Sequence, residues 1–97
     1  MNYYFHPQAQ VEFEQAIEYY EECKKNLGYD FAIQVYDAIH SIVNFPSTWP
    51  ELKPGIRRCL VKRFPYGVIY SMEQGDILIL AVMHLHRSPD YWESRIQ

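Results

Sequence analysis

The chain has 97 residues, a hydrophobic fraction of 48% and a formal net charge of −3. This composition fits one folded domain with one core and excludes a largely disordered protein. No apolar stretch approaches the roughly eighteen residues of a membrane span, and no signal-peptide pattern follows Met1. We therefore expect one cytoplasmic domain, residues 1–97, with no membrane partner.

Charge is divided unevenly along the chain. Residues 1–52 carry eight acidic and two basic side chains, whereas residues 53–97 carry seven basic and four acidic side chains. Nine tyrosines are more than one core of this size needs, so some of them should lie on a surface that a partner covers. We expect the basic second half to contact that partner, either a nucleic acid or an acidic protein.

The first half predicts a short strand and two helices. Residues 2–5 favour an aromatic strand, and Pro7 suits the first turn of the helix that follows. Gly28 is expected to end this helix, and Asp30 is expected to cap a second helix that stops before Pro46. Apolar spacings of three and four predict that each helix buries one stripe. The stripes are Phe13, Ala16, Ile17 and Tyr20, then Phe31, Val35, Ile39 and Ile42.

The second half predicts a rigid loop and a small sheet. Residues 46–56 are rich in proline, and the strands are expected at 57–62, 66–72 and 76–83. The last strand is apolar on both faces, which is typical of a central strand. The predicted class is α+β: an N-terminal strand, an antiparallel helical hairpin and a three-stranded antiparallel meander. The helices are expected on one sheet face, against Leu60, Val68, Tyr70 and Leu80.

Several local motifs follow one another along nearly the whole chain. They are Tyr19-Tyr20-Glu21, Leu27-Gly28 with Phe31, Phe45-Pro46, Trp49-Pro50, Gly55-Ile56-Arg57-Arg58, Arg63-Phe64-Pro65-Tyr66 with Ile69-Tyr70, and Ala81-Val82 with residues 84–92. Together they resemble the RelE/ParE superfamily of toxins from bacterial type II toxin–antitoxin operons. They are most similar to the ParE-like branch, whose members are often labelled plasmid-stabilisation proteins. The resemblance implies a RelE/ParE-like fold, a labile cognate antitoxin that wraps the toxin, and no cofactor.

The resemblance implies one of two activities. ParE-type toxins poison DNA gyrase by protein contact, whereas RelE-type toxins are ribosome-dependent endoribonucleases that cut mRNA in the ribosomal A site. Arg58 and Tyr91 match the RelE-type pattern, but Leu60, Gly67 and Leu85 stand where that pattern has basic residues. These departures favour a gyrase inhibitor over an enzyme. A third alternative is a toxin that has lost its activity and persists as an antitoxin-binding module.

The candidate site residues depend on which activity the chain has. Metal-independent RNA cleavage needs a base, an acid and cations for the developing phosphorane charge. A nuclease would draw these from Arg58, Arg63, His84, His86, Arg87 and Tyr91. A contact inhibitor would meet its target or antitoxin through Arg57, Arg58, Arg63, Arg87, Tyr91 and Trp92, although Trp92 alternatively anchors the tail on the sheet.

Two further expectations concern partners. His84 and His86 lie two residues apart, but no third ligand has suitable spacing, so we expect no metal site. Part of the sheet, or the groove beside the helices, should be unfinished in the isolated chain. An antitoxin segment would complete it as a helix or an added strand, with its acidic residues meeting Arg57, Arg58 and Arg63.

Overall fold

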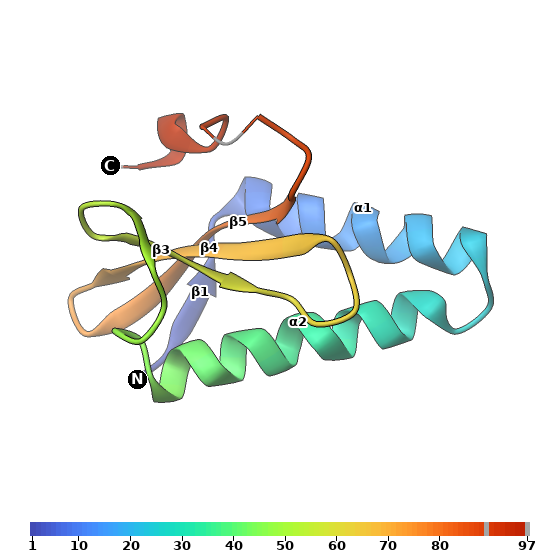
Figure 1. Cartoon of the computed structure of the whole chain (residues 1–97), viewed down its shortest axis with the longest axis horizontal. Helices are drawn as coiled ribbons and strands as arrows, with labels where there is room; N and C mark the ends of the chain where they lie inside the picture. The colour runs from blue at the N-terminus through green and yellow to red at the C-terminus, as the bar shows by residue number, and fades with distance from the viewer. Residues whose placement is uncertain (89, 97) are drawn as a thin grey trace.

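Two helices and a five-stranded mixed sheet make up the computed structural model, which describes residues 1–88 and 90–96 (Figure 1). In spatial order the sheet runs β1-β5-β4-β3-β2, with β1 parallel to β5 and every other pair antiparallel. The elements are β1 (Tyr3–Phe5), α1 (Pro7–Cys23), α2 (Leu27–Asn44), β2 (Glu51–Lys53), β3 (Ile56–Leu60), β4 (Tyr66–Glu73), β5 (Asp76–His84) and a short 3-10 turn (Glu93–Arg95). The α+β class and the order of the predicted elements are confirmed, but the sheet is larger than the predicted meander.

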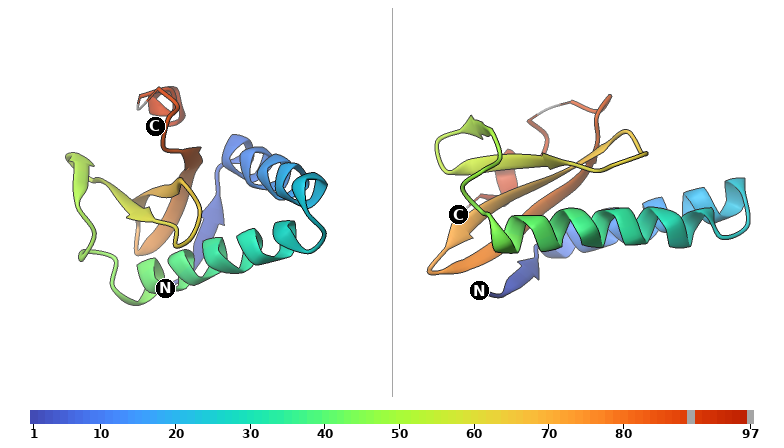
Figure 2. Two further views of the ribbon diagram at one scale, coloured as in Figure 1. Left: turned by 45° about the vertical axis from the view of Figure 1, so that its right-hand side comes forward. Right: turned by 60° about the horizontal axis from the view of Figure 1, so that its bottom comes forward.

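The two helices form an antiparallel hairpin against one face of the sheet, and the chain after β5 crosses the opposite face (Figure 2). The predicted helical stripes are confirmed. Phe31, Val35 and Ile42 are fully buried, and Ile17 and Tyr20 are half-buried against the same cluster. Neither described helix has the length and apolar content that crossing a membrane would require.

The predicted roles of Gly28 and Asp30 are wrong. α1 ends at Cys23, and Asn26 takes the left-handed conformation (φ 72°) that was assigned to the glycine. Gly28 lies inside the first turn of α2, where a Cβ would come within 2.5 Å of the Ile17 carbonyl oxygen. Glu21 of α1 accepts hydrogen bonds from the backbone N–H groups of Asn26 and Gly28, so α2 needs no cap from Asp30. Glycine is therefore required for close helix packing.

The predicted proline-rich loop contains an additional strand. β2 pairs antiparallel with β3 at the edge of the sheet, with Pro50 just before it and Pro54 just after it. Proline is tolerated at an edge because no further strand needs its missing N–H. The short, proline-bounded sequence has no period-two pattern that could have predicted it.

Contrary to the prediction, Leu60 and Leu80 do not pack under the helices. Leu60 is 56% exposed on the opposite face, and Leu80 belongs to the cluster beneath the C-terminal segment. The cause at Leu80 is a bulge, because Ile69 pairs with Ala81 while Tyr70 pairs with Ile79. The extra residue shifts the alternation, so Leu80 leaves the helix side of the sheet. Val68 and Tyr70 lie on that side, as predicted, together with Cys59, Val61, Ile77, Ile79 and Val82.

Candidate functional site

The described part of the C-terminal segment, residues 85–88 and 90–96, lies on the sheet face away from the helices (Figure 2). Trp92 is only 2% exposed, and it packs with Ile56, Ile69, Leu80, Ala81 and Met83. Its indole N–H has no hydrogen-bond partner within the described chain, so apolar packing alone holds it. Trp92 therefore anchors the C-terminal segment on the sheet, which was the alternative to a role in target contact. Pro89, also in this segment, lies outside the described residues.

A buried ion pair joins this segment to α1. Both carboxylate oxygens of Glu12 accept hydrogen bonds from the Arg95 guanidinium, each at 2.9 Å. The two side chains are 12% and 7% exposed. Arg87 lies 3.4 Å from the same carboxylate. Sequence reasoning missed both Glu12 and Arg95. The available signal was that Glu12 falls three residues after buried Ala9 and four before buried Ala16, on the inward side of α1.

Two arginines lie close to the Tyr91 ring. The Arg87 guanidinium carbon is 3.7 Å from the ring centroid and that of Arg95 is 5.0 Å from it, both within range of cation–π attraction. The Tyr91 hydroxyl is buried and has no hydrogen-bond partner among the described residues. Burial raises the pKa of Tyr91 well above that of an ordinary phenol, and the Glu12 carboxylate raises it further. At neutral pH Tyr91 is thus a neutral, stacked ring and a poor proton donor.

The two histidines lie at the end of β5. The His84 ring meets the edge of Tyr66 and lies 5.1 Å from the His86 ring. The backbone N–H of His86 donates to Nδ1 of His84. No cluster of three or more metal-ligating side chains occurs among residues 1–88 and 90–96.

The three arginines that are expected to meet acidic antitoxin residues do not form one patch. Arg57 faces the helix side, where it donates to the Trp49 carbonyl at 2.6 Å and lies 3.9 Å from Glu51. Arg63 follows β3 in a left-handed conformation (φ 71°) and lies 3.8 Å from Asp30. Arg58 faces the opposite side of the sheet and has no ion pair within the described residues. An antitoxin would have to reach these arginines at three separate places.

The three positions that depart from the RelE-type pattern lie together. Leu60 and Gly67 are directly paired across β3 and β4, and a Cβ on Gly67 would lie 3.5 Å from the Leu85 side chain. The same Cβ would lie 3.0 Å from Cδ of Arg58, so glycine lets the Arg58 stem lie flat over the strand. We call Arg58, Leu60, Gly67 and Leu85 the open patch. It carries one cation and two leucines, which suits contact with a protein better than stabilisation of a phosphorane.

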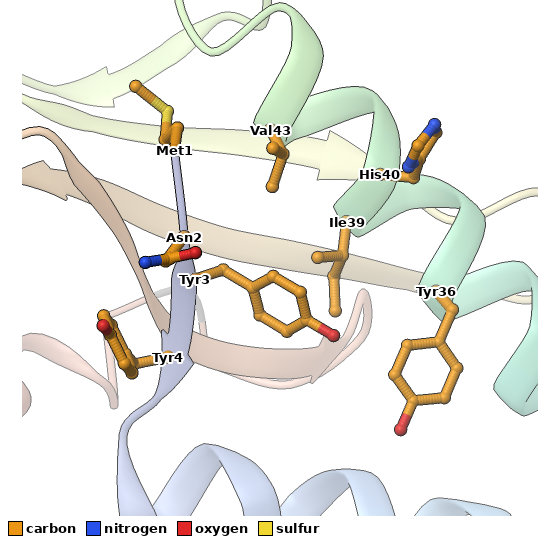
Figure 3. A pocket seen from close by; sticks show the side chains of 8 residues that line it. All are labelled: Met1, Asn2, Tyr3, Tyr4, Tyr36, Ile39, His40 and Val43. Carbon is orange, nitrogen blue, oxygen red and sulfur yellow. The ribbon is translucent and has the colours of Figure 1, made fainter.

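A second candidate surface lies at the other edge of the sheet. A pocket of about 550 Å³ opens between β1 and the second half of α2 (Figure 3). Its lining residues are Met1, Asn2, Tyr3, Tyr4, Tyr36, Ile39, His40 and Val43. The Tyr3 ring points toward Ile39 and Tyr36, while Tyr4 lies on the other side of the strand. No carboxylate lines the pocket.

The outer edge of β1 is unpaired in the described chain. On the inner edge, Ile77 donates its N–H to the Asn2 carbonyl and His6 donates to the Ile79 carbonyl, both at 2.8 Å. Alternation along a parallel ladder directs the N–H and C=O groups of Tyr3 and Phe5 outward. These groups, beside exposed tyrosines, form a template for an added strand.

Comparison with known proteins points to one family. A family model described as the ParE toxin of the type II toxin–antitoxin system, parDE, matches residues 3–89. No curated protein matches the chain. Among solved structures, the chromosomal ParDE TA system from P. aeruginosa aligns with a TM-score of 0.62 and 16% identity, over 89% of this chain and 97% of that one. At this level of identity the structural likeness concerns the fold.

Proposed function

The chain belongs to the ParE toxin family of type II toxin–antitoxin systems, and we propose that it inhibits DNA gyrase by protein contact. A cognate ParD antitoxin, encoded with it, would neutralise it in the cytoplasm. The observation that carries the choice of mechanism is the open patch. Leu60, Gly67 and Leu85 converge at the place where RelE-type cleavage would need basic side chains, and they leave Arg58 as its one cation.

The alternative, a ribosome-dependent endoribonuclease, is less well supported by the remaining candidates. Arg63 lies beside Asp30, and Arg87 beside Glu12 and the Tyr91 ring. The buried Tyr91 phenol, whose pKa is raised by burial, would be slow to exchange a proton with RNA. Exposed Leu60 instead offers the apolar area that a protein contact uses.

A direct experiment measures both activities on the same preparation. Toxin separated from its antitoxin is added to purified gyrase in a supercoiling assay and to a translating extract in which mRNA integrity is followed. We expect inhibited supercoiling and intact mRNA. Cleaved mRNA with unaffected gyrase would establish the nuclease instead. Activity in neither assay, with antitoxin binding retained, would identify an inactive antitoxin-binding module.

A matched pair of variants tests the open patch as the contact. Leu60→Asp places a charge on an exposed position of the patch, and Tyr29→Asp places the same charge on α2, where the side chain is 67% exposed. We expect Leu60→Asp to weaken gyrase inhibition by about tenfold and Tyr29→Asp to leave it unchanged. Equal inhibition by both variants would exclude the patch from the contact.

The antitoxin would add an extended segment to the outer edge of β1 and fill the pocket beside it. The unpaired backbone groups of Tyr3 and Phe5 support this mode, as do the exposed rings of Tyr3, Tyr4 and Tyr36. Amide exchange should therefore slow at Tyr3 and Phe5 when antitoxin binds. Exchange at Ile77, already bonded to Asn2, is the internal control.

Acidic antitoxin residues would also meet Arg57, Arg58 and Arg63, at separate places on the surface. Replacing all three by alanine should weaken antitoxin binding by about tenfold. The binding of this variant should also depend less on salt concentration than that of the parent protein. Arg58→Ala should account for the largest part, because Arg57 and Arg63 already lie beside Glu51 and Asp30. Equal affinity of the triple variant would remove the electrostatic part of the proposal.

A further inference from the structure

After Ile79, β5 has no neighbouring strand on the β1 side, and side chains bond its backbone groups there instead. β1 ends at Phe5, and the bulge at Leu80 follows the last paired residue, Ile79. The Leu80 carbonyl accepts a hydrogen bond from Nη1 of Arg95 at 2.9 Å. The backbone N–H of Val82 donates to Oε1 of Glu12 at 3.2 Å. Glu12 and Arg95 therefore take over the hydrogen bonding of a strand edge that would otherwise be buried without partners.

Glu12 is the one group that all parts of this network share. Its carboxylate accepts from Val82 of β5, from two nitrogens of Arg95 and, more weakly, from Arg87. Nε of Arg95 donates to the Gln8 side chain, one turn earlier on α1. Both arginines in turn lie within cation–π range of the Tyr91 ring. Without the carboxylate, two guanidinium groups would share this half-buried site with no compensating charge.

We propose that Glu12 is the positioning residue of the C-terminal segment: from α1, it orients Arg87, Arg95 and the Tyr91 ring, and so holds residues 85–96 in the geometry that a target contacts. The link to a target rests on the proposed function. Glu12 itself, 12% exposed behind Arg87 and Arg95, does not touch the target. The segment thus has two fastenings of different kinds, the apolar anchor Trp92 and the ionic network of Glu12.

The test compares three variants of the full chain by amide hydrogen exchange. Glu12→Gln removes the charge and keeps the shape, Glu12→Asp keeps the charge at shorter reach, and Glu14→Gln is the control on the exposed face of the same helix. We expect exchange in residues 85–96 to accelerate about 100-fold in Glu12→Gln, less in Glu12→Asp and not at all in Glu14→Gln. Exchange within α2 should stay unchanged in all three.

Unchanged exchange in residues 85–96 of Glu12→Gln would overturn the proposal. Equal acceleration in α2 would also overturn it, because Glu12 would then support the whole fold rather than this segment. If Glu12→Gln does not fold, the decision passes to Glu12→Asp, whose loss of protection must be confined to residues 85–96. Gyrase inhibition is measured in parallel. A released segment with full inhibition would uphold the role of Glu12 and reject the target contact assigned to the segment.

Discussion

The two faces of the sheet are built differently. Among the described residues, the face under the helices is closed by a cluster of sixteen buried residues from both helices, three strands and the loop between β3 and β4, whereas the opposite face has a cluster of six around Trp92. The larger cluster joins both helices to β3, β4 and β5, so its loss is a loss of the fold. The smaller one depends on a single segment held by one indole and one carboxylate. The helix side therefore holds most of the buried core, and the opposite face is held by fewer contacts.

The largest effect should follow from opening the helix-side cluster at its centre. Phe31 is fully buried and contacts the rings of Phe13, Tyr20, Phe64 and Tyr66. Phe31→Ala should lower the free energy of unfolding by about 4 kcal/mol, measured by denaturant titration. Tyr29→Ala, on the exposed side of the same helix, should change it by less than about 0.5 kcal/mol. A smaller loss for Phe31→Ala than for Trp92→Ala would reverse the comparison.

Removing the anchor on the opposite face should have a smaller and more local effect. Trp92→Ala should cost about 3 kcal/mol in the protection of residues 85–96 against amide exchange, with much less change within α2. Gyrase inhibition should fall with it, since the segment loses its place on the sheet. Trp92→Phe keeps an apolar ring, and it should retain most of both properties. Uniform loss of protection throughout the chain would contradict the division between the two faces.

The thiols report how tightly the helix-side cluster is closed. Burial raises the pKa of Cys59 to about 11, whereas Cys23 is exposed at the end of α1. A raised pKa means less thiolate, and burial restricts access, so Cys59 should react with an alkylating reagent at pH 8 at least about 100-fold more slowly than Cys23. The two rates can be followed by mass spectrometry. Similar rates in the folded protein would show that this cluster opens readily.

The smallest effect is expected from the hydroxyl of Tyr91. It has no hydrogen-bond partner of good geometry among the described residues, so Tyr91→Phe removes little more than a weak contact with Glu12 and leaves the ring beside Arg87 and Arg95. Toxicity should change by less than about threefold. A nuclease that used this phenol for proton transfer would lose about a hundredfold or more. Loss of toxicity in Tyr91→Phe, with antitoxin binding and thermal stability unchanged, would favour that mechanism.

The regular parts of this fold could be predicted from the sequence, and the parts set by distant contacts could not. Helical spacing identified Phe31, Val35 and Ile42 as core residues, because the apolar face of a helix can be recognised from the local spacing of its apolar residues. A strand that is apolar at every position shows no alternation, so its sequence does not tell which side chains face the helices. One bulged residue placed Leu80 on the unexpected face, and no local signal predicted the bulge.

The candidate site shows the same division. The motifs located Tyr91 and Trp92, and the departures at Gly67 and Leu85 proved to be neighbours in space. Glu12 is one of several acidic residues in α1, and its partner Arg95 lies 83 residues later in the chain. Contacts between residues so far apart have no short-range pattern from which to predict them.

The parallel pairing of β1 with β5 sets an order of events during synthesis. The residues that pair with β1, Ile77 and Ile79 among them, are made more than seventy positions after it. The helical hairpin, whose contacts are local, can form while the chain is still growing, but β1 must wait until β5 has been made. Until then both edges of β1 are unpaired. A chain released before β5 is made would therefore have neither a complete sheet nor the surface that its face presents, so premature termination should yield harmless fragments.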